Sequence, residues 1–283
     1  MLPIPYVLDE AAVAAPSEQV GAPRKADSKD ALSDLFHISL YKPNYLLPGY
    51  YSTSPDQGVY AGHTPDNQRI AHTDVKFQLS LKVAVLSNIR GLPLTLYGAY
   101  TQLSYWQAYD RSAFFRESNY EPSVFLRYAW HKALPADWRW KWVDFGAVHQ
   151  SNGRGGQLER SWNRVYLSSS FEHRAWTVDI DAWYPLHDAS MTDHNPDIAH
   201  YLGYGQWVLS YHFGKDRKQT IAFLSRNNLT SGFSRGAEEL TWSFPLVQAL
   251  KGYVQIFSGY GQSLIEYDHR TNAVGIGITL NDW

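Results

Sequence analysis

Apolar and polar residues alternate along most of this chain with a period of two residues. In the segment 76–83, apolar side chains take every second position, at Phe77, Leu79, Leu81 and Val83. The positions between them are polar: Lys76, Gln78, Ser80 and Lys82. A period of two is the pattern of a β-strand with two different faces. Almost nothing in the chain follows the helical period, so the pattern predicts an all-β protein.

About twelve segments of this kind follow one another. They lie near 36–46, 71–87, 92–108, 119–131, 138–151, 160–172, 174–185, 200–213, 218–228, 236–245, 250–260 and 271–281. Many exceed the roughly five or six residues of an ordinary strand and match the roughly 9–11 residues with which a tilted strand crosses a bilayer. Their second face carries Lys, Arg, Asp, Gln and Tyr, as a polar barrel interior does. The pattern predicts a twelve-stranded antiparallel transmembrane β-barrel over residues 35–283, with a large soluble β-sandwich as the alternative.

The first 34 residues differ from the rest of the chain. Residues 1–34 are rich in Ala, Pro and charge without sustained periodicity, which predicts a largely irregular tail. The first five residues have neither the basic nor the apolar region of a signal peptide, so either the chain is not exported or its signal peptide has already been removed.

The composition favours a membrane surface over other partners. The chain has 20 Tyr, 11 Trp and 12 Phe but only 2 Met, and Tyr and Trp are enriched where a bilayer meets water. A net charge of −2 provides no basic field, so we expect no nucleic-acid partner. The absence of cysteine excludes disulfides and thiolate metal sites.

Three polar residues lie on the apolar faces of two neighbouring segments. In the segment 141–151, the odd positions from Val143 onward are the more apolar ones, and His149 and Ser151 continue that face. In the next segment, Asn163 belongs to the face that carries Val165 and Leu167. If the two strands form a hairpin, Asn163 lies level with His149.

Such a trio on a lipid-facing wall is costly unless its members bond one another. Serine, histidine and asparagine are also the nucleophile, base and orienting group of acyl hydrolases. An amide stabilises an imidazolium less than a carboxylate does, so a bound cation near the developing oxyanion is expected. The residues alone leave another interpretation open, because the pattern His-x-Ser is short and a histidine at a strand end is usually interfacial.

The segments H-Q-S-N-G-R (149–154) and R-S-W-N-R (160–164) resemble the active-site motif of the outer membrane phospholipase A family. Further segments resemble that family in the same order: VKFQLSL (75–81), AYTQLS (99–104), FRESNYEP (115–122), NPDI (195–198), YLGY (201–204), SGYGQSLI (258–265) and LND (280–282). The resemblance extends from about residue 40 to the C-terminus.

The resemblance implies a twelve-stranded barrel in the outer membrane of a Gram-negative bacterium, with its active site on the outer wall at the extracellular leaflet. It also implies hydrolysis of phospholipid acyl esters with A1, A2 and lysophospholipase activity, a requirement for calcium, and activity as a homodimer. By position, Ser151 is the implied nucleophile, His149 the base and Asn163 the orienting residue.

The resemblance also implies a set of calcium ligands. The family uses a serine in the loop before F-R-E, the carbonyl of the arginine in H-x-S-N-G-R, and a serine four residues before the catalytic asparagine. These positions are Ser112, Arg154 and Glu159 in this chain. Glu159 departs from the pattern, but a carboxylate is a stronger calcium ligand than a hydroxyl.

Two further features have competing interpretations. Gln102 matches a glutamine of the family's dimer interface, whereas a lone glutamine in a strand is equally compatible with a position facing the lumen. Asp193 and Asp197 suggest a second metal site, but a solvated loop explains these carboxylates better.

Two functions compete with a calcium-dependent phospholipase. One is a passive pore, which needs a wide lumen, and twelve strands lined with large side chains such as Trp142, Trp162, Arg164 and Tyr166 leave little room. The other is a soluble glycan-binding β-sandwich, which would not require detergent for extraction.

Overall fold

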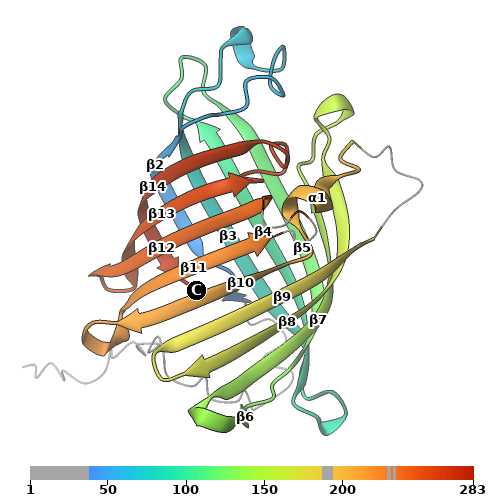
Figure 1. Ribbon diagram of the computed structural model, residues 1–283, viewed down its shortest axis with the longest axis vertical. Helices are drawn as coiled ribbons and strands as arrows, with labels where there is room; N and C mark the ends of the chain where they lie inside the picture. Colours follow the sequence, from blue (N-terminus) through green and yellow to red (C-terminus); the bar gives the residue numbers. More distant parts are fainter. Residues whose placement is uncertain (1–37, 187–193, 228–230, 232–233) are drawn as a thin grey trace, which may run out of the picture.

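A computed structural model of the protein describes residues 38–186, 194–227, 231 and 234–283. The tail expected at residues 1–34 and the carboxylate of Asp193 lie outside these described residues. The described chain is almost entirely β-structure (Figure 1). No helix in the described ranges has the length and apolar character needed to cross a membrane.

Twelve long strands form the wall of the barrel. They are β2 (Asn44–Ser52), β3 (Thr73–Leu86), β4 (Leu94–Gln107), β5 (Phe114–Tyr128), β7 (Arg139–Ser151), β8 (Ser161–His173), β9 (Trp176–Leu186), β10 (Gly205–Phe213), β11 (Gln219–Asn227), β12 (Gly236–Val247), β13 (Leu250–Tyr260) and β14 (Arg270–Asn281). Two short strands are added to it, β1 (Ile38–Leu40) on β3 and β6 (Lys132–Ala133) on β7.

The helical segments are short. They comprise α1 (Ile198–Leu202) and the 3-10 turns η2 (Pro65–Asn67), η3 (Ile89–Gly91), η4 (Pro135–Asp137), η5 (Gly156–Leu158) and η6 (Lys215–Arg217).

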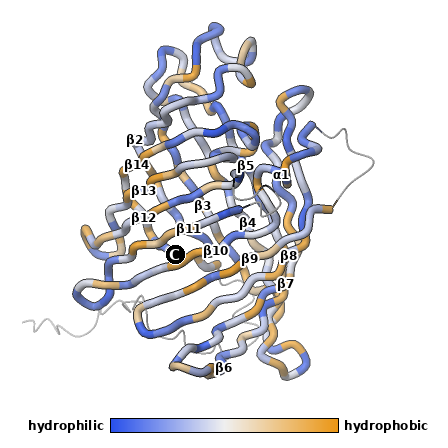
Figure 2. Tube along the Cα trace, viewed as in Figure 1, coloured by the Kyte–Doolittle hydropathy of each residue, from blue (hydrophilic) through white to orange (hydrophobic). Residues whose placement is uncertain are grey.

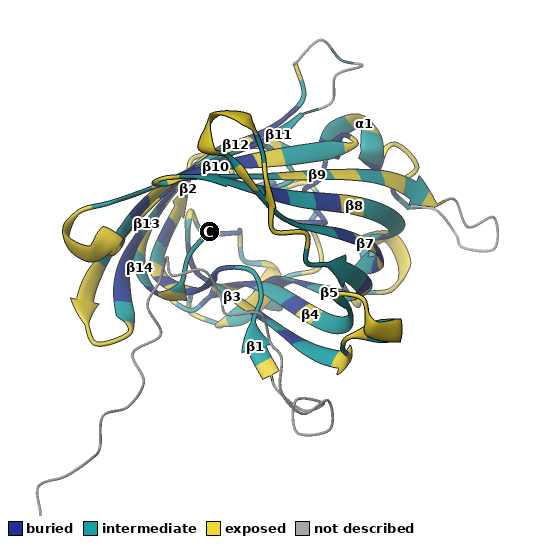
Figure 3. Ribbon diagram, turned by 90° about the horizontal axis from the view of Figure 1, so that it is seen from below, coloured by how far each residue is buried: buried dark blue, intermediate teal, exposed yellow. Residues whose placement is uncertain are grey.

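The sheet closes on itself without a free edge. Each wall strand pairs antiparallel with the next wall strand along the chain, and β2 pairs with both β3 and β14. The view along the barrel shows the resulting ring (Figure 3). The predicted twelve-stranded antiparallel barrel is therefore confirmed.

The two faces of the strands also follow the prediction. On β3, Lys76 and Lys82 are buried inside the barrel, whereas Leu79 is exposed on the outside. On β14, Val274 and Ile276 are exposed. Apolar and polar positions alternate along the strands throughout the barrel (Figure 2), and exposed and buried positions alternate with them (Figure 3).

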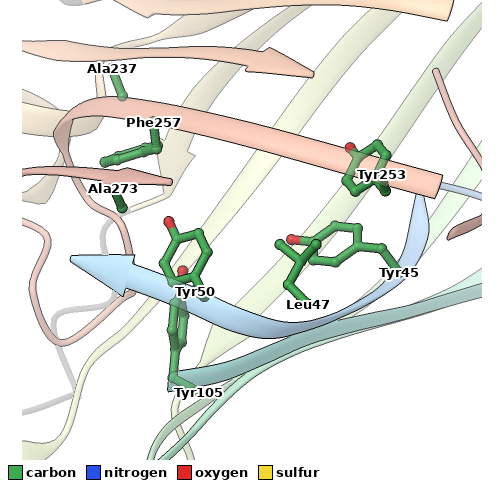
Figure 4. Close-up of a cluster of buried hydrophobic side chains, with 8 residues drawn as sticks. All are labelled: Tyr45, Leu47, Tyr50, Tyr105, Ala237, Tyr253, Phe257 and Ala273. Atoms are coloured by element: carbon green, nitrogen blue, oxygen red, sulfur yellow. The ribbon is translucent and has the colours of Figure 1, made fainter. Parts of the chain in front are cut away.

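Large side chains fill the interior. A buried cluster consists of Tyr45, Leu47, Tyr50, Tyr105, Ala237, Tyr253, Phe257 and Ala273, contributed by β2, β4, β12, β13 and β14 (Figure 4). The ammonium of Lys76 lies 4.4 Å from the ring centre of Tyr50 and donates to Gln255 Oε1 at 2.7 Å. An interior packed in this way disfavours a passive pore.

Two predicted strands differ from the observed ones at their ends. The first, expected at 36–46, is interrupted at residues 41–43, where Pro43 has no N–H to donate, and continues as β2 to Ser52. The segment expected at 200–213 begins instead with α1, which ends at Gly203 with a φ of 72°. Ile198 and Leu202 of α1 pack on Trp162 and Tyr267, and this contact stabilises a helix that the local pattern does not indicate.

Candidate active site

The β7–β8 hairpin places three candidate residues on the outer wall. His149 is the cross-strand partner of Asn163, and Ser151 is the partner of Ser161, as the hairpin register predicted. On the same face of β7, Phe145 is 62% exposed, whereas its neighbour Asp144 on the other face is 1% exposed. His149, Ser151 and Asn163 are therefore on the apolar outer side of the barrel and half-buried.

Asn163 orients the ring of His149 by a hydrogen bond. His149 Nδ1 lies 2.8 Å from Asn163 Oδ1. Because an amide oxygen only accepts, Nδ1 carries the proton, which leaves Nε2 with a lone pair that can take up another proton. No hydrogen bond joins Ser151 Oγ to His149 in the described chain, and such catalytic bonds are often longer in a free enzyme than in its substrate complex.

The loop between β7 and β8 is held by the side chain of Asn152. Its Nδ2 donates to the Leu158 carbonyl at 2.8 Å, and its Oδ1 accepts from the N–H groups of Arg154 at 3.3 Å and Arg160 at 3.0 Å. Gly153 has a φ of +62°, a conformation that favours glycine. The side chain of Asn152 therefore fixes the shape of the loop next to Ser151.

Two of the three expected calcium ligands share this loop. Arg154 and Glu159 are both partly exposed, and the Glu159 carboxylate forms no ion pair with any described residue. Ser112 lies in another loop, between β4 and β5, where its hydroxyl donates to Asp66 Oδ2 at 2.6 Å. The described residues contain no group of three His, Cys, Asp or Glu side chains suited to a metal, so a calcium site here needs carbonyl or hydroxyl oxygens in addition to any single carboxylate.

Gln102 faces outward rather than into the lumen. It shares its face of β4 with the exposed residues Tyr100 and Trp106. Tyr100 OH donates to Gln102 Oε1 at 3.1 Å, and Gln102 Nε2 donates to Ser104 Oγ at 3.1 Å. The alternative of a lumen-facing glutamine is therefore wrong, and the outer wall carries a polar row at this point.

Asp197 is exposed and accepts a hydrogen bond from Tyr267 OH at 2.7 Å. This contact fastens the segment before α1 to the loop between β13 and β14, so Asp197 has a structural role that needs no metal.

A buried ion cluster lies behind the candidate site at the same end of the barrel. Arg116, whose side chain is 0% exposed, pairs with Asp74 at 3.0 Å and with Glu266 at 2.7 Å. Burial opposes the ionisation of Glu266, but the Arg116 guanidinium and hydrogen bonds from Ser263 and the Asp56 N–H outweigh it, so the pKa of Glu266 lies below its ordinary value. The cluster ties β3 and β5 to the β13–β14 loop.

We expect Arg116→Met to lower the free energy of unfolding by about 3–5 kcal/mol, because it leaves two buried carboxylates without a cation. The lowered pKa of Glu266 means that its contribution to stability is present above its unfolded pKa near 4.5 and is lost as the pH falls through its native pKa. In the variant, burial is no longer opposed by the cation, so the pKa of Glu266 rises. The loss of stability in Arg116→Met relative to wild type should therefore be largest at neutral pH and smaller in acid.

Denaturant unfolding in detergent at neutral and acidic pH measures this difference. Arg139→Met is the control, because Arg139 forms an exposed pair with Glu172, worth at most about 1 kcal/mol. Equal stability of Arg116→Met and wild type at neutral pH would contradict the prediction.

Asn152 and Glu117 also contribute to this region, although the strand pattern did not indicate them. Both lie inside quoted motifs, at 149–154 and 115–122, and both are buried. A signal was present for Glu117, because a carboxylate on the inner face of a strand needs a partner. The sequence does not reveal which of several arginines provides it.

Comparison with known proteins identifies the family. A family model described as Phospholipase A1 matches residues 23–280. The Phospholipase A1 of Proteus vulgaris is 37% identical over 249 residues, which cover 87% of this chain and 82% of the relative. The Phospholipase A1 of Escherichia coli is 36% identical with the same coverage.

Solved structures agree with this assignment. The outer membrane phospholipase A of Escherichia coli has a TM-score of 0.79 at 36% identity, covering 87% of this chain and 99% of that one. The outer membrane phospholipase of Salmonella typhi, solved as a dimer with bound calcium, has a TM-score of 0.80 at 35% identity, covering 88% and 94%. This chain therefore belongs to the phospholipase A1 family and is a phospholipase of the Gram-negative outer membrane.

Proposed function

We propose that this phospholipase is calcium-dependent and hydrolyses acyl esters with A1, A2 and lysophospholipase activity, using Ser151, His149 and Asn163. The observation that carries the proposal is the 2.8 Å hydrogen bond between His149 and Asn163, on the same lipid-facing wall as Ser151. Polar groups are costly on such a wall, so their presence there marks a functional site. The site faces the outer leaflet of the membrane.

The reaction follows from the arrangement of the three side chains. Ser151 Oγ attacks the ester carbonyl while His149 Nε2 takes the hydroxyl proton. The C–O bond to the lipid alcohol breaks, and His149 returns the proton to that leaving group. Water then attacks the acyl-enzyme, again giving a proton to His149, and the Ser151 oxygen regains it as the fatty acid departs. Asn163 keeps the same tautomer of His149 throughout.

The outer wall gives this site direct access to its substrate. A phospholipid in the outer leaflet reaches Ser151 by lateral movement, without passing through the packed interior of the barrel. The ester near the headgroup then lies at the level of the strand ends, where β7 finishes.

The oxygen donors next to Ser151 fit a calcium ion. The Arg154 carbonyl accepts no hydrogen bond within the described chain, and the Glu159 carboxylate is unpaired there. Calcium binds oxygen ligands of these kinds. When bound, the ion supplies a positive charge that stabilises a developing oxyanion, which offsets the weaker stabilisation of the His149 imidazolium by an amide. The calcium in the Salmonella relative supports this proposal.

We further propose a homodimer that forms through the wall around Gln102 and completes the calcium site, with Ser112 as its remaining ligand. The outward polar row from Tyr100 to Ser104 supports this interface, because polar groups in a lipid-facing wall gain partners when two barrels associate. The Salmonella relative is a dimer.

Fatty-acid release from detergent-dispersed phospholipid tests the proposed function. We expect release with calcium and none with chelator, and labels on each acyl chain distinguish A1 from A2 activity. Hydrolysis that is equally fast with chelator would contradict the calcium requirement, and release of one acyl chain alone would contradict the mixed specificity.

Asn163→Ala should reduce kcat by about ten- to a hundredfold, less than His149→Ala does. The substitution removes one hydrogen bond that strengthens when His149 is charged, worth about 1.5–3 kcal/mol, while the ring can still adopt its working tautomer part of the time. Steady-state assays of both variants, with heat-stability of the barrel as a check on folding, measure the difference. Equal losses would indicate that Asn163 does more than orient the ring.

A further inference from the structure

The side chain of Arg154 is anchored inside the mouth of the barrel. Its Nε donates to Glu117 Oε2 at 3.2 Å, and its Nη2 donates to the carbonyl of Arg116. The Glu117 side chain is 0% exposed, whereas that of Arg154 is 26% exposed. The proposed calcium-binding loop is therefore joined to β5 by a buried carboxylate.

Glu117 is itself fixed from two directions. Its Oε1 accepts from Asn119 Nδ2 at 2.8 Å and from the N–H of Ile265 at 3.2 Å. Ile265 belongs to the β13–β14 loop, which the Arg116–Glu266 pair holds against β5. The carboxylate therefore cannot follow Arg154 if the loop moves, and it acts as a rigid anchor.

The backbone of Arg154 is restrained as well. Its N–H donates to Asn152 Oδ1, and the preceding residue, Gly153, has a positive φ that few residues adopt. With the amide nitrogen and the side chain both held, the Cα of Arg154 stays in place, and so does the position from which its carbonyl is presented. That carbonyl is the proposed ligand.

We infer that Glu117 is a positioning residue of the calcium site, which acts through its ion pair with Arg154 to hold the Arg154 carbonyl at that site. This inference rests on the proposed calcium dependence. The pair has a second effect, since Glu117 neutralises a guanidinium that would otherwise repel a divalent cation. Groups that orient metal ligands commonly change affinity by about 10–100-fold when they are removed.

Arg154→Ala is the direct test, because it removes the anchor and keeps the carbonyl. We expect about a tenfold or greater rise in the Kd for calcium, measured by titration calorimetry of the detergent-solubilised protein. Glu117→Gln should raise the Kd in the same direction, and the double variant should be no worse than the more affected single variant.

A second measurement needs no calcium. With chelator present, amide hydrogen exchange in residues 153–159 should be faster in Arg154→Ala than in wild type. Arg127→Ala is the matched control, since it removes a half-buried arginine from β5 that pairs with Asp144 at 2.7 Å on the inner face. The control should lower stability without changing the calcium Kd or exchange in the loop.

The outcomes separate this inference from the proposed function. If wild type binds calcium and Arg154→Ala binds it equally well, the positioning role is wrong and the calcium site stands. If wild type neither binds calcium nor needs it for hydrolysis, the proposed calcium dependence fails, and this inference fails with it. Arg154 is partly exposed, so its variant keeps the test available if Glu117→Gln does not fold.

Discussion

Ser151→Ala should abolish ester hydrolysis, with a loss of at least about a thousandfold in kcat. The substitution removes the protein atom that forms a covalent bond with the acyl group in the proposed reaction, and neither His149 nor Asn163 can replace it. The barrel should be unaffected, because Ser151 lies at the end of β7 and its side chain is half-buried. Fatty-acid release with calcium present measures the loss, and a serine-directed sulfonyl fluoride should label wild type but not the variant.

Ser161 provides the matched control. It is the cross-strand partner of Ser151, so Ser161→Ala deletes the same hydroxyl group from the same stretch of wall. We expect this control to keep activity within a few-fold of wild type and to retain the sulfonyl label. Activity of Ser151→Ala within a few-fold of wild type would show that Ser151 is not the nucleophile.

The strand faces of this protein could be predicted because a barrel offers only two environments. Lys76 must lie inside if Phe77 lies outside, and one such choice propagates along a whole strand. The same logic predicted that His149 and Ser151 share the outer face and that Asn163 lies level with His149. All of these are local relations between adjacent residues or adjacent strands.

Features that depend on contacts between distant segments could not be predicted in this way. The helix α1 forms because Ile198 and Leu202 pack on residues from β8 and from the β13–β14 loop. Likewise, the pairing of Glu117 with Arg154 joins residues 37 positions apart. Several arginines were available to that carboxylate, and only the fold selects one. The roles of the triad and of the calcium ligands stay predictions, because they concern chemistry rather than position.

Glu159→Lys should be close to inactive, with a loss of more than about a hundredfold in activity. A fixed ammonium at this position repels calcium and offers no open coordination position to a substrate oxygen. Glu159→Ser, which restores the hydroxyl of the family pattern, should keep part of the activity and raise the calcium concentration for half-maximal activity by about tenfold. Gln157→Lys is the control, because it adds a cation to the same loop and leaves the proposed ligand in place.

Calcium and dimerisation should also be linked through Glu159. If two protomers complete the site, calcium favours the dimer and the dimer favours calcium to the same extent. Without the ion, a carboxylate from each protomer is brought into a water-poor interface, where like charges repel and association is opposed. Sedimentation in detergent should therefore show more dimer with calcium than with chelator. The increase in dimer on adding calcium should be smaller for Glu159→Ser, because its hydroxyl carries no charge that needs neutralising.

A chelated wild type that dimerises as well as the calcium-loaded protein would contradict the linkage. An unchanged calcium titration in Glu159→Ser would show that Glu159 is not a ligand, and the ion would then depend on the Arg154 carbonyl and hydroxyl oxygens.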